Sequence, residues 1–182
     1  MLRLTDLSQR ARFGCKGPAA EQWLRGKGFP LPTAGNHWRV DQAGVLVARL
    51  GSSEYLVEAV ADGNAAVAAA DRELASLAAV SAGVYWVARQ DRVLQLSGCP
   101  AAELLLECCS INFRDLTGNA EPGGGPLVLT SMLGVAVLVV PEPHVDDPCF
   151  TIWCDPSFGS YLSSSLLELV HAREHRSDGI TQ

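Results

Sequence analysis

The chain has 182 residues, of which 48% are hydrophobic and 19% charged, and this is the composition of a soluble globular protein. Its 14 Lys and Arg residues against 20 Asp and Glu residues give a formal net charge of -6, without the basic clusters that nucleic acid or an anionic membrane would require. The longest apolar run, Met132–Val140, is too short to span a membrane, and the opening residues do not form a secretory signal. We therefore expect a cytoplasmic protein with no nucleic acid or membrane partner.

A chain of this length can bury one substantial core without disulfides or a metal, so we expect one domain over residues 1–182. The cysteines lack a C-x-x-C pair or the spacing of known structural metal sites. Most of them lie in apolar runs and are interpreted as reduced, buried side chains. The six are Cys15, Cys99, Cys108, Cys109, Cys149 and Cys154.

The first half of the chain predicts an irregular opening followed by a strand-strand-helix unit. Residues 1–40 are polar and glycine-rich, without a clear hydrophobic period. Residues 45–50 and 55–60 predict two strands around a tight turn. Residues 64–79 carry apolar side chains at helical spacing among alanines, which predicts an amphipathic helix. The first unit therefore covers residues 41–80.

The second half, residues 83–176, predicts a similar unit with extra strands. A hairpin is expected from residues 84–89 and 92–96 with a turn at Gln90 and Asp91, and a helix from Pro100 to Cys109. Residues 121–126 are expected to form a loop. Strands are expected at residues 127–132, 135–140 and 149–154, and then a final helix to about His175 before a tail at residues 177–182. The expected apolar stripe of this helix is Phe158, Leu162, Leu166 and Leu169.

This order of elements predicts an α+β fold built from duplicated strand-strand-helix units, with helices packed on a largely antiparallel sheet. A weak internal repeat matches Pro18–Leu24 with Pro100–Leu106, and each copy begins a predicted helix with proline. The match is short enough to leave duplication and chance equally open.

Several motifs could carry chemistry, but each has a plainer interpretation. His171 and His175 match the H-x-x-E-H zinc pattern, yet they lie opposite the leucine stripe and few residues follow to supply a third ligand. The segment Gly14–Gly17 could bind an anion but lacks a phosphate-loop pattern. Glu142, His144, Asp146 and Asp147 could bind a cation, although a solvated loop is favoured. We expect no catalytic, cofactor-binding or metal-binding residue in this chain.

Short motifs in a fixed order resemble one family over nearly the whole chain, the gamma subunit of heterotetrameric sarcosine oxidase. The resemblance begins with Leu4–Ser8 and Arg12–Ala20 and ends with Phe150, Asp155 and Tyr161-Leu162. Between them lie further matching segments: Trp23-Leu24, Asn36-His37-Trp38, Val47–Gly51, Glu54–Leu56, Arg89–Asp91 and Leu96–Leu105.

The resemblance implies a fold related to the folate-binding domain of the glycine-cleavage T-protein and a role as a non-catalytic accessory subunit. In that family FAD, FMN, NAD and tetrahydrofolate belong to the larger alpha and beta subunits, which carry out amine catabolism linked to one-carbon metabolism. The alternative is a free-standing folate-binding or one-carbon-binding protein of the aminomethyltransferase type. A zinc hydrolase is a distant third hypothesis.

A partner interface is expected in the opening region, where tryptophans suited to interfaces lie in a segment without periodic structure. Trp86 and Trp153 lie in predicted strands and are expected in the core. The candidate interface residues are Arg12, Lys16, Trp23, Asn36, His37 and Trp38.

Overall fold

The computed structural model describes residues 1–60, 64–77, 83–117, 123–142 and 148–178. The chain forms two compact units. Unit 1 comprises residues 1–8, 90–122 and 128–182, and unit 2 comprises residues 9–89 and 123–127. Each unit contains an antiparallel sheet and helices, so the predicted α+β class is confirmed. A single domain over residues 1–182 stays a prediction.

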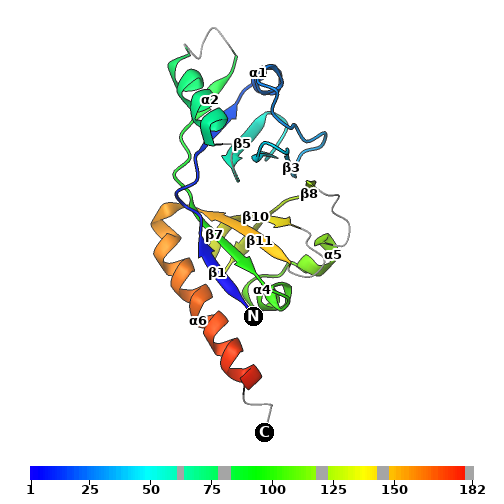
Figure 1. Cartoon of the computed structure of the whole chain (residues 1–182), viewed down its shortest axis with the longest axis vertical. Helices are drawn as coiled ribbons and strands as arrows, with labels where there is room; N and C mark the ends of the chain where they lie inside the picture. The colour runs from blue at the N-terminus through cyan, green and yellow to red at the C-terminus, as the bar shows by residue number, and fades with distance from the viewer. Residues whose placement is uncertain (61–63, 78–82, 118–122, 143–147, 179–182) are drawn as a thin grey trace. The chain divides into compact units, whose positions relative to one another are not determined.

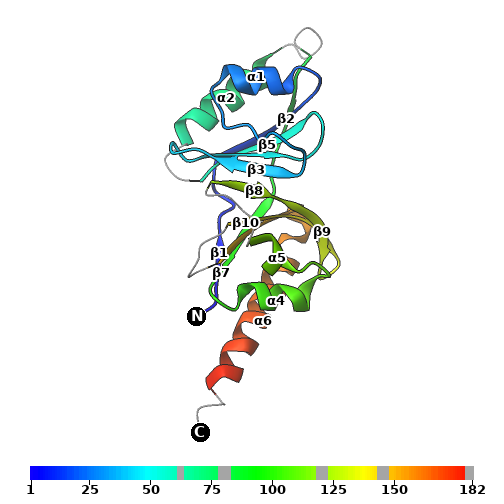
Figure 2. The same cartoon turned by 90° about the vertical axis from the view of Figure 1, so that its right-hand side faces the viewer.

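Unit 2 has a six-stranded sheet with the strand order β6-β2-β5-β4-β3-β8. Helices α1 (Ala20–Gly26) and α2 (Asn64–Ser76) pack on one face of it (Figure 2). The core between them includes Phe13, Leu24, Val57 and Leu74. The strands are β2 (Arg12–Lys16), β3 (His37–Val40), β4 (Val45–Arg49), β5 (Glu54–Ala59), β6 (Tyr85–Val87) and β8 (Gly124–Pro126).

Unit 1 has a five-stranded sheet with the strand order β1-β7-β11-β10-β9. Its core packs helices α4 (Ala101–Cys108), α5 (Phe113–Thr117) and α6 (Gly159–Asp178) against one face of the sheet. Figure 1 shows α6 running beside β1 and β7, which it contacts. The strands are β1 (Arg3–Asp6), β7 (Arg92–Ser97), β9 (Val128–Met132), β10 (Val135–Glu142) and β11 (Cys149–Cys154). None of the helices in the described ranges is long and apolar enough to cross a membrane.

The elements that show a clear local period are confirmed. Strands β4 and β5 form the predicted hairpin, and α2 buries Val67, Ala70 and Leu74 at helical spacing. Helix α4 and strands β9, β10 and β11 also lie where expected, within a few residues. Before α6, the Asp155 carboxylate accepts a hydrogen bond of 2.8 Å from the Ser157 N–H and caps the short helix η1 (Pro156–Phe158).

The expectation of an irregular opening is wrong, because β1, β2, α1 and β3 all lie within residues 1–40. These strands are short and their partners are distant in sequence: β1 pairs with β7, and β2 pairs with β5 and β6. Gly14 makes β2 still harder to predict from the sequence, because glycine has low strand propensity. A Cβ at Gly14 would lie 3.0 Å from the Val87 Cβ of the neighbouring strand. Glycine therefore allows this close approach.

The predicted hairpin of residues 84–96 is also wrong. Strand β6 pairs with β2 in unit 2, whereas β7 pairs with β1 and β11 in unit 1. Strands β6 and β7 are adjacent in sequence, but each forms its hydrogen bonds with strands elsewhere in the chain. The predicted loop at residues 121–126 contains strand β8, which pairs with β3. At the last helix, Phe158 is exposed, and the buried stripe is Leu162, Leu166 and Val170.

Five strands of each sheet follow the same order. The series β6-β2-β5-β4-β3 in unit 2 corresponds to β1-β7-β11-β10-β9 in unit 1. Helices α1 and α4 follow the corresponding strands β2 and β7, and the repeated segments Pro18–Leu24 and Pro100–Leu106 begin in front of these helices. This arrangement differs from the predicted strand-strand-helix repeat. A common origin of the two units stays a prediction.

A glycine with φ of +120° precedes the first helix of each unit, at Gly17 and Gly98. A Cβ at Gly17 would lie 2.5 Å from the carbonyl oxygen of Gly83, next to strand β6. A Cβ at Gly98 would meet the carbonyl oxygen of Met1, next to strand β1, even more closely. The backbone just before the outer strands β6 and β1 therefore lies where only glycine leaves room.

Alanine at Gly17 or Gly98 should lower the free energy of unfolding by about 2–4 kcal/mol, because it adds a clash with backbone to a disfavoured backbone conformation. Gly26→Ala is the matched control, since a Cβ there meets nothing within 4 Å and φ is not positive. The control should change stability by less than about 1 kcal/mol. Urea unfolding measures all three, and equal effects of the three changes would contradict the role of the close approach.

Candidate functional site

An open groove of about 460 Å³ lies between helices α1 and α2 of unit 2. The volume is within the range of small-molecule sites, which spans roughly 300–1,000 Å³. Trp23 and Lys27 come from α1 and the residue after it, whereas Glu73 comes from α2. The complete lining is Ala19, Gln22, Trp23, Gly26, Lys27, Glu73 and Val84.

Trp23 is half-buried at this groove and is held from two sides. The Phe13 ring meets it edge to face, with a centroid separation of 6.2 Å and an interplanar angle of 87°. The Lys27 ammonium lies 5.3 Å from the centroid of the Trp23 ring, in a cation–π contact. The same ammonium pairs with the Glu73 carboxylate at 2.5 Å. The ion pair therefore connects α1 to α2 across the groove, with both charges already compensated.

A second charged cluster lies at the start of α1. The Glu21 carboxylate accepts a hydrogen bond of 2.9 Å from Arg25 and one of 3.3 Å from the Tyr55 hydroxyl, and it lies 3.5 Å from the Arg49 guanidinium. The hydrogen bond from Arg25, followed by the charge of Arg49, lowers the pKa of Glu21. Burial raises the pKa of Tyr55. These contacts keep Glu21 ionised and Tyr55 neutral, which suits a structural cluster more than a proton-transfer site.

The six predicted interface residues differ in how far they are exposed. Lys16 and Asn36 are exposed, Trp23 and His37 are partly buried, and Trp38 is only 3% exposed. Trp38 is therefore a buried residue of β3 and not an exposed anchor. His37 lies beside it, where its Nδ1 is 2.9 Å from the carbonyl oxygen of Gly35.

Arg12 is also not available to pair with a charged residue of a partner subunit. Its Nε donates a hydrogen bond of 2.9 Å to Glu58, and the side chains are 4% and 0% exposed respectively. Arg10 approaches the same carboxylate at 3.5 Å. Removal of Arg12 would leave the buried Glu58 short of its nearest cation, so the pair belongs to the internal structure of unit 2.

The Gly14–Gly17 segment does not form an anion-binding site of backbone N–H groups. The Gly17 N–H donates to the carbonyl of Ser53, the Ala19 N–H to Gly83, and the Ala20 N–H to Gly17. These are the donors that an anion at the start of α1 would need. Cys15 next to them is buried, and burial raises the pKa of its thiol to about 12. The thiol is therefore a poor nucleophile.

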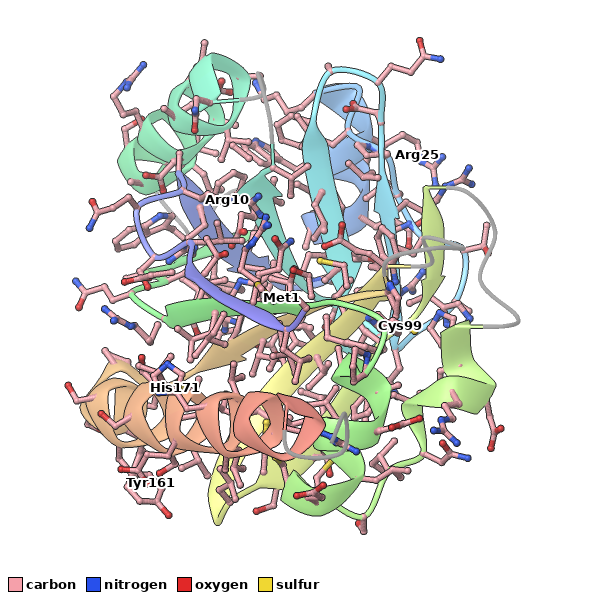
Figure 3. The ribbon with its side chains drawn as sticks, turned by 60° about the horizontal axis from the view of Figure 1, so that its bottom comes forward. Met1, Arg10, Arg25, Cys99, Tyr161 and His171 are labelled. Carbon is pink, nitrogen blue, oxygen red and sulfur yellow. The ribbon has the colours of Figure 1, made fainter. Side chains whose placement is uncertain are left out.

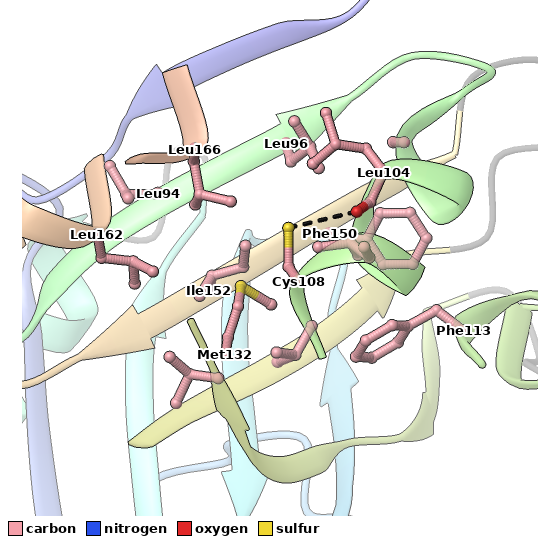
Figure 4. Close-up of a cluster of buried hydrophobic side chains, with 14 of the residues drawn as sticks. Leu94, Leu96, Leu104, Cys108, Phe113, Met132, Phe150, Ile152, Leu162 and Leu166 are labelled. Atoms are coloured by element: carbon pink, nitrogen blue, oxygen red, sulfur yellow. Dashed lines mark hydrogen bonds between the residues drawn. The ribbon is translucent and has the colours of Figure 1, made fainter. Parts of the chain in front are cut away.

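The adjacent Cys108 and Cys109 at the end of α4 donate hydrogen bonds to carbonyls of their own helix, Leu104 and Leu105. Figure 4 shows Cys108 among the buried side chains of unit 1. Burial, together with neighbouring Cys109 and Glu107, raises the pKa of the Cys108 thiol to about 11. Cys99 differs from the other cysteines because it is exposed, which corrects the expectation that it packs in the core.

Metal-ligand groups do not converge within the described ranges: no three His, Cys, Asp or Glu side chains lie close enough to hold an ion. His171 is exposed on α6 (Figure 3). The neighbouring Arg173 pairs with Glu103 and Glu107 of α4 at 3.2 and 3.3 Å. Glu142 accepts a hydrogen bond of 2.8 Å from Thr151, while its predicted companions His144, Asp146 and Asp147 lie outside the described residues.

Two features of unit 2 were missed from the sequence. Lys27 and Glu73 are 46 residues apart, so only the tertiary structure brings them together. The spacing of Trp23 and Lys27, four residues apart at the end of α1, is the signal that could have indicated their contact. Trp86 was expected in the core, but it is 45% exposed and its indole N–H donates to Asp71 at 2.8 Å. Trp153 is buried as expected.

Thiol labelling should separate the cysteines by exposure and pKa. We expect a charged aromatic disulfide reagent at mildly alkaline pH to modify Cys99 first, and Cys15 and Cys108 only after the protein unfolds. The reason is that the thiolate is the reactive form and burial disfavours it. Mass spectrometry of partially labelled protein identifies the sites, with Cys99→Ser as the control that removes the fast phase. Fast labelling of Cys15 in the folded chain would contradict its burial.

No known family model matches the sequence, and no curated protein matches it. The fold is shared with solved structures, among them the following two. The first is a chain of heterotetrameric sarcosine oxidase from Corynebacterium sp. U-96 in complex with pyrrole 2-carboxylate, with 20% identity, a TM-score of 0.71, and coverage of 94% of this chain and 84% of that chain. The second is the glycine cleavage system aminomethyltransferase T from Bartonella henselae, with 16% identity, a TM-score of 0.58, and coverage of 91% of this chain but only 45% of that chain. The relationship expected from the sequence is confirmed at the level of fold.

Proposed function

We propose that this chain is the non-catalytic accessory subunit of a heterotetrameric, flavin-dependent sarcosine oxidase or a related secondary-amine oxidase. The observation that carries the proposal is the coverage in both directions: the fold match spans 94% of this chain and 84% of a chain of sarcosine oxidase. The aminomethyltransferase is matched over 45% of its length, so more than half of that protein has no counterpart here. The extent of the fold match therefore supports the role of an oxidase subunit.

The chemistry of the described side chains supports this role. The charged residues at the groove and at the start of α1 are paired with one another, as Lys27 is with Glu73 and Glu21 is with Arg25. The two thiols with strongly raised pKa values are protonated at neutral pH. Groups in this state stabilise a fold, whereas a reactive centre usually holds a group poised to titrate or attack.

In the proposed complex, FAD, FMN, NAD and tetrahydrofolate belong to the larger alpha and beta subunits. The chain would act in the cytoplasm, in amine catabolism that feeds one-carbon metabolism. Of the residues expected at the partner interface, Trp23, Lys16, Asn36 and His37 keep that role in the proposal. Trp38 and Arg12 do not, because their side chains are buried in this chain.

The second candidate is a free-standing folate-binding or one-carbon-binding protein, which the likeness to the aminomethyltransferase fold favours. Such a protein needs a concave pocket with an available polar group for the pterin ring. The groove between α1 and α2 is open, and its carboxylate, Glu73, is engaged by Lys27. A pterin would have to displace that ion pair. Titration of the isolated chain with tetrahydrofolate by calorimetry distinguishes the two candidates, since the accessory subunit should release no binding heat.

The proposal predicts different behaviour for the isolated chain and for the chain purified from its native host. Produced alone in a heterologous host, it should be colourless and should not generate hydrogen peroxide from sarcosine, because the reacting groups lie on other subunits. Affinity purification of the tagged chain from the native host should recover larger chains, flavin absorbance and amine-dependent peroxide formation together.

The control is the same purification from a host that carries the tag on an unrelated protein. Oxidation of sarcosine by the isolated chain would contradict the non-catalytic role. Recovery of the chain alone and colourless from its native host, under conditions in which the host degrades sarcosine, would contradict the subunit role.

A further inference from the structure

The two sheets have four outer strands, and three of them carry features that discourage pairing with another chain. Strand β6 has only three residues, and β8 is the three-residue segment Gly-Gly-Pro. Strand β1 begins with Arg3 and ends with Asp6, which pairs with Arg92. Shortness, proline and charge are the usual means by which soluble proteins block sheet edges.

The fourth outer strand, β9, has none of these features. It has five residues, Val-Leu-Thr-Ser-Met, and no charged residue occurs between Pro122 and Pro141. It lies at one end of the unit 1 sheet, where it pairs with β10 (Figure 2). Leu129 in its middle is 58% exposed and Ser131 is also exposed. This strand is an uncharged and accessible edge.

The register of β9 shows which backbone groups face outward. Leu133 and Gly134 connect β9 to β10 with φ values of +51° and +82°, as in a two-residue type I′ hairpin. The flanking pair, Met132 and Val135, is then hydrogen-bonded, and Ser131 and Leu129 occupy non-hydrogen-bonded positions opposite Ala136 and Leu138. The N–H and C=O groups of Leu129 and Ser131 therefore point to the open edge. No hydrogen bond to them occurs among the described residues.

Unit 2 shows how the corresponding edge is covered within the same chain. Strand β3 occupies the position that β9 occupies in unit 1, and a sixth strand, β8, pairs with its outer edge through Gly124–Pro126. The unit 1 sheet ends at β9 and has no sixth strand among the described residues. The same edge is thus covered by a short, uncharged, extended segment in unit 2, whereas no described segment pairs with it in unit 1.

We propose that β9 receives an extended, uncharged segment of a larger partner subunit, which adds as a sixth strand to the unit 1 sheet. This inference rests on the proposed function, because it assumes that the chain is part of a complex. Backbone groups of the partner segment would pair with Leu129 and Ser131, and an apolar side chain of the segment would cover Leu129. Strand addition of this kind takes most of its affinity from main-chain hydrogen bonds.

Ser131→Pro tests the proposal, because it removes an outward N–H without removing a hydrogen bond to β10. Ser131→Lys places a charge on the same edge and serves as the second variant if the proline variant does not fold. Ala136→Lys is the matched control: it adds the same charge directly opposite Ser131, on the inner strand β10, at a position that is also exposed. Thermal unfolding of each isolated variant verifies that the fold is kept.

Tagged wild-type and variant chains are purified from the native host, and the larger flavin-carrying chains recovered per mole of tagged chain are measured. We expect Ser131→Pro and Ser131→Lys to reduce recovery by at least about tenfold, the effect of roughly 1.4 kcal/mol, and Ala136→Lys to leave it nearly unchanged. Hydrogen exchange should show the amides of Leu129 and Ser131 exchanging fast in the isolated chain and slowly in the complex.

The other outcomes overturn the inference in separable ways. If wild-type and Ser131 variants recover the partner equally, or if the two amides stay unprotected in the complex, strand addition at β9 is wrong while the proposed function stands. If the isolated chain forms a dimer that Ser131→Pro dissociates, the occupant of the edge is a second copy of this chain. If wild-type recovers no partner, the proposed function fails and this inference fails with it.

Discussion

In each unit, the backbone just before one outer strand of the sheet lies directly against the glycine that precedes the first helix. Gly17 faces the backbone beside β6, and Gly98 faces the backbone beside β1, without space for a side chain at either contact. This close approach fixes where α1 and α4 begin relative to their sheets. The position of α1 in turn places Trp23 and Lys27 across from Glu73, so the groove of unit 2 depends on the same constraint.

Local hydrophobic periodicity predicts the elements whose partners are close in sequence. The β4–β5 hairpin, α2 and α4 follow from two apolar runs around a tight turn, alanine-rich amphipathicity and a proline before the helix. Strands β1 and β2 do not, because they are short and pair with residues about forty or more positions away. The β6–β7 error has the same origin: strands adjacent in sequence are expected to pair, whereas these two belong to different sheets.

Residue type predicts less about the candidate site than about the fold. Trp23 and Trp38 are both expected at an interface because they are large amphipathic side chains in a segment without a clear period, but Trp38 is buried in β3. Arg12 was expected to face a partner and instead pairs with Glu58, a buried carboxylate whose need for a cation is visible only in three dimensions. Whether a strand such as β9 lies at the exposed edge depends on the order of the strands in the sheet. The hydrophobic period of the sequence does not indicate that order.

We propose that this chain contributes to an amine oxidase through its surfaces, while the reacting groups belong to other subunits. A cryo-electron microscopy map of the complex purified through this chain is the most direct test. We expect both sheets of this chain to be intact, all flavin and folate density to lie on the larger chains, and added density to follow the outer edge of β9. Flavin or folate density enclosed by either unit of this chain would contradict it.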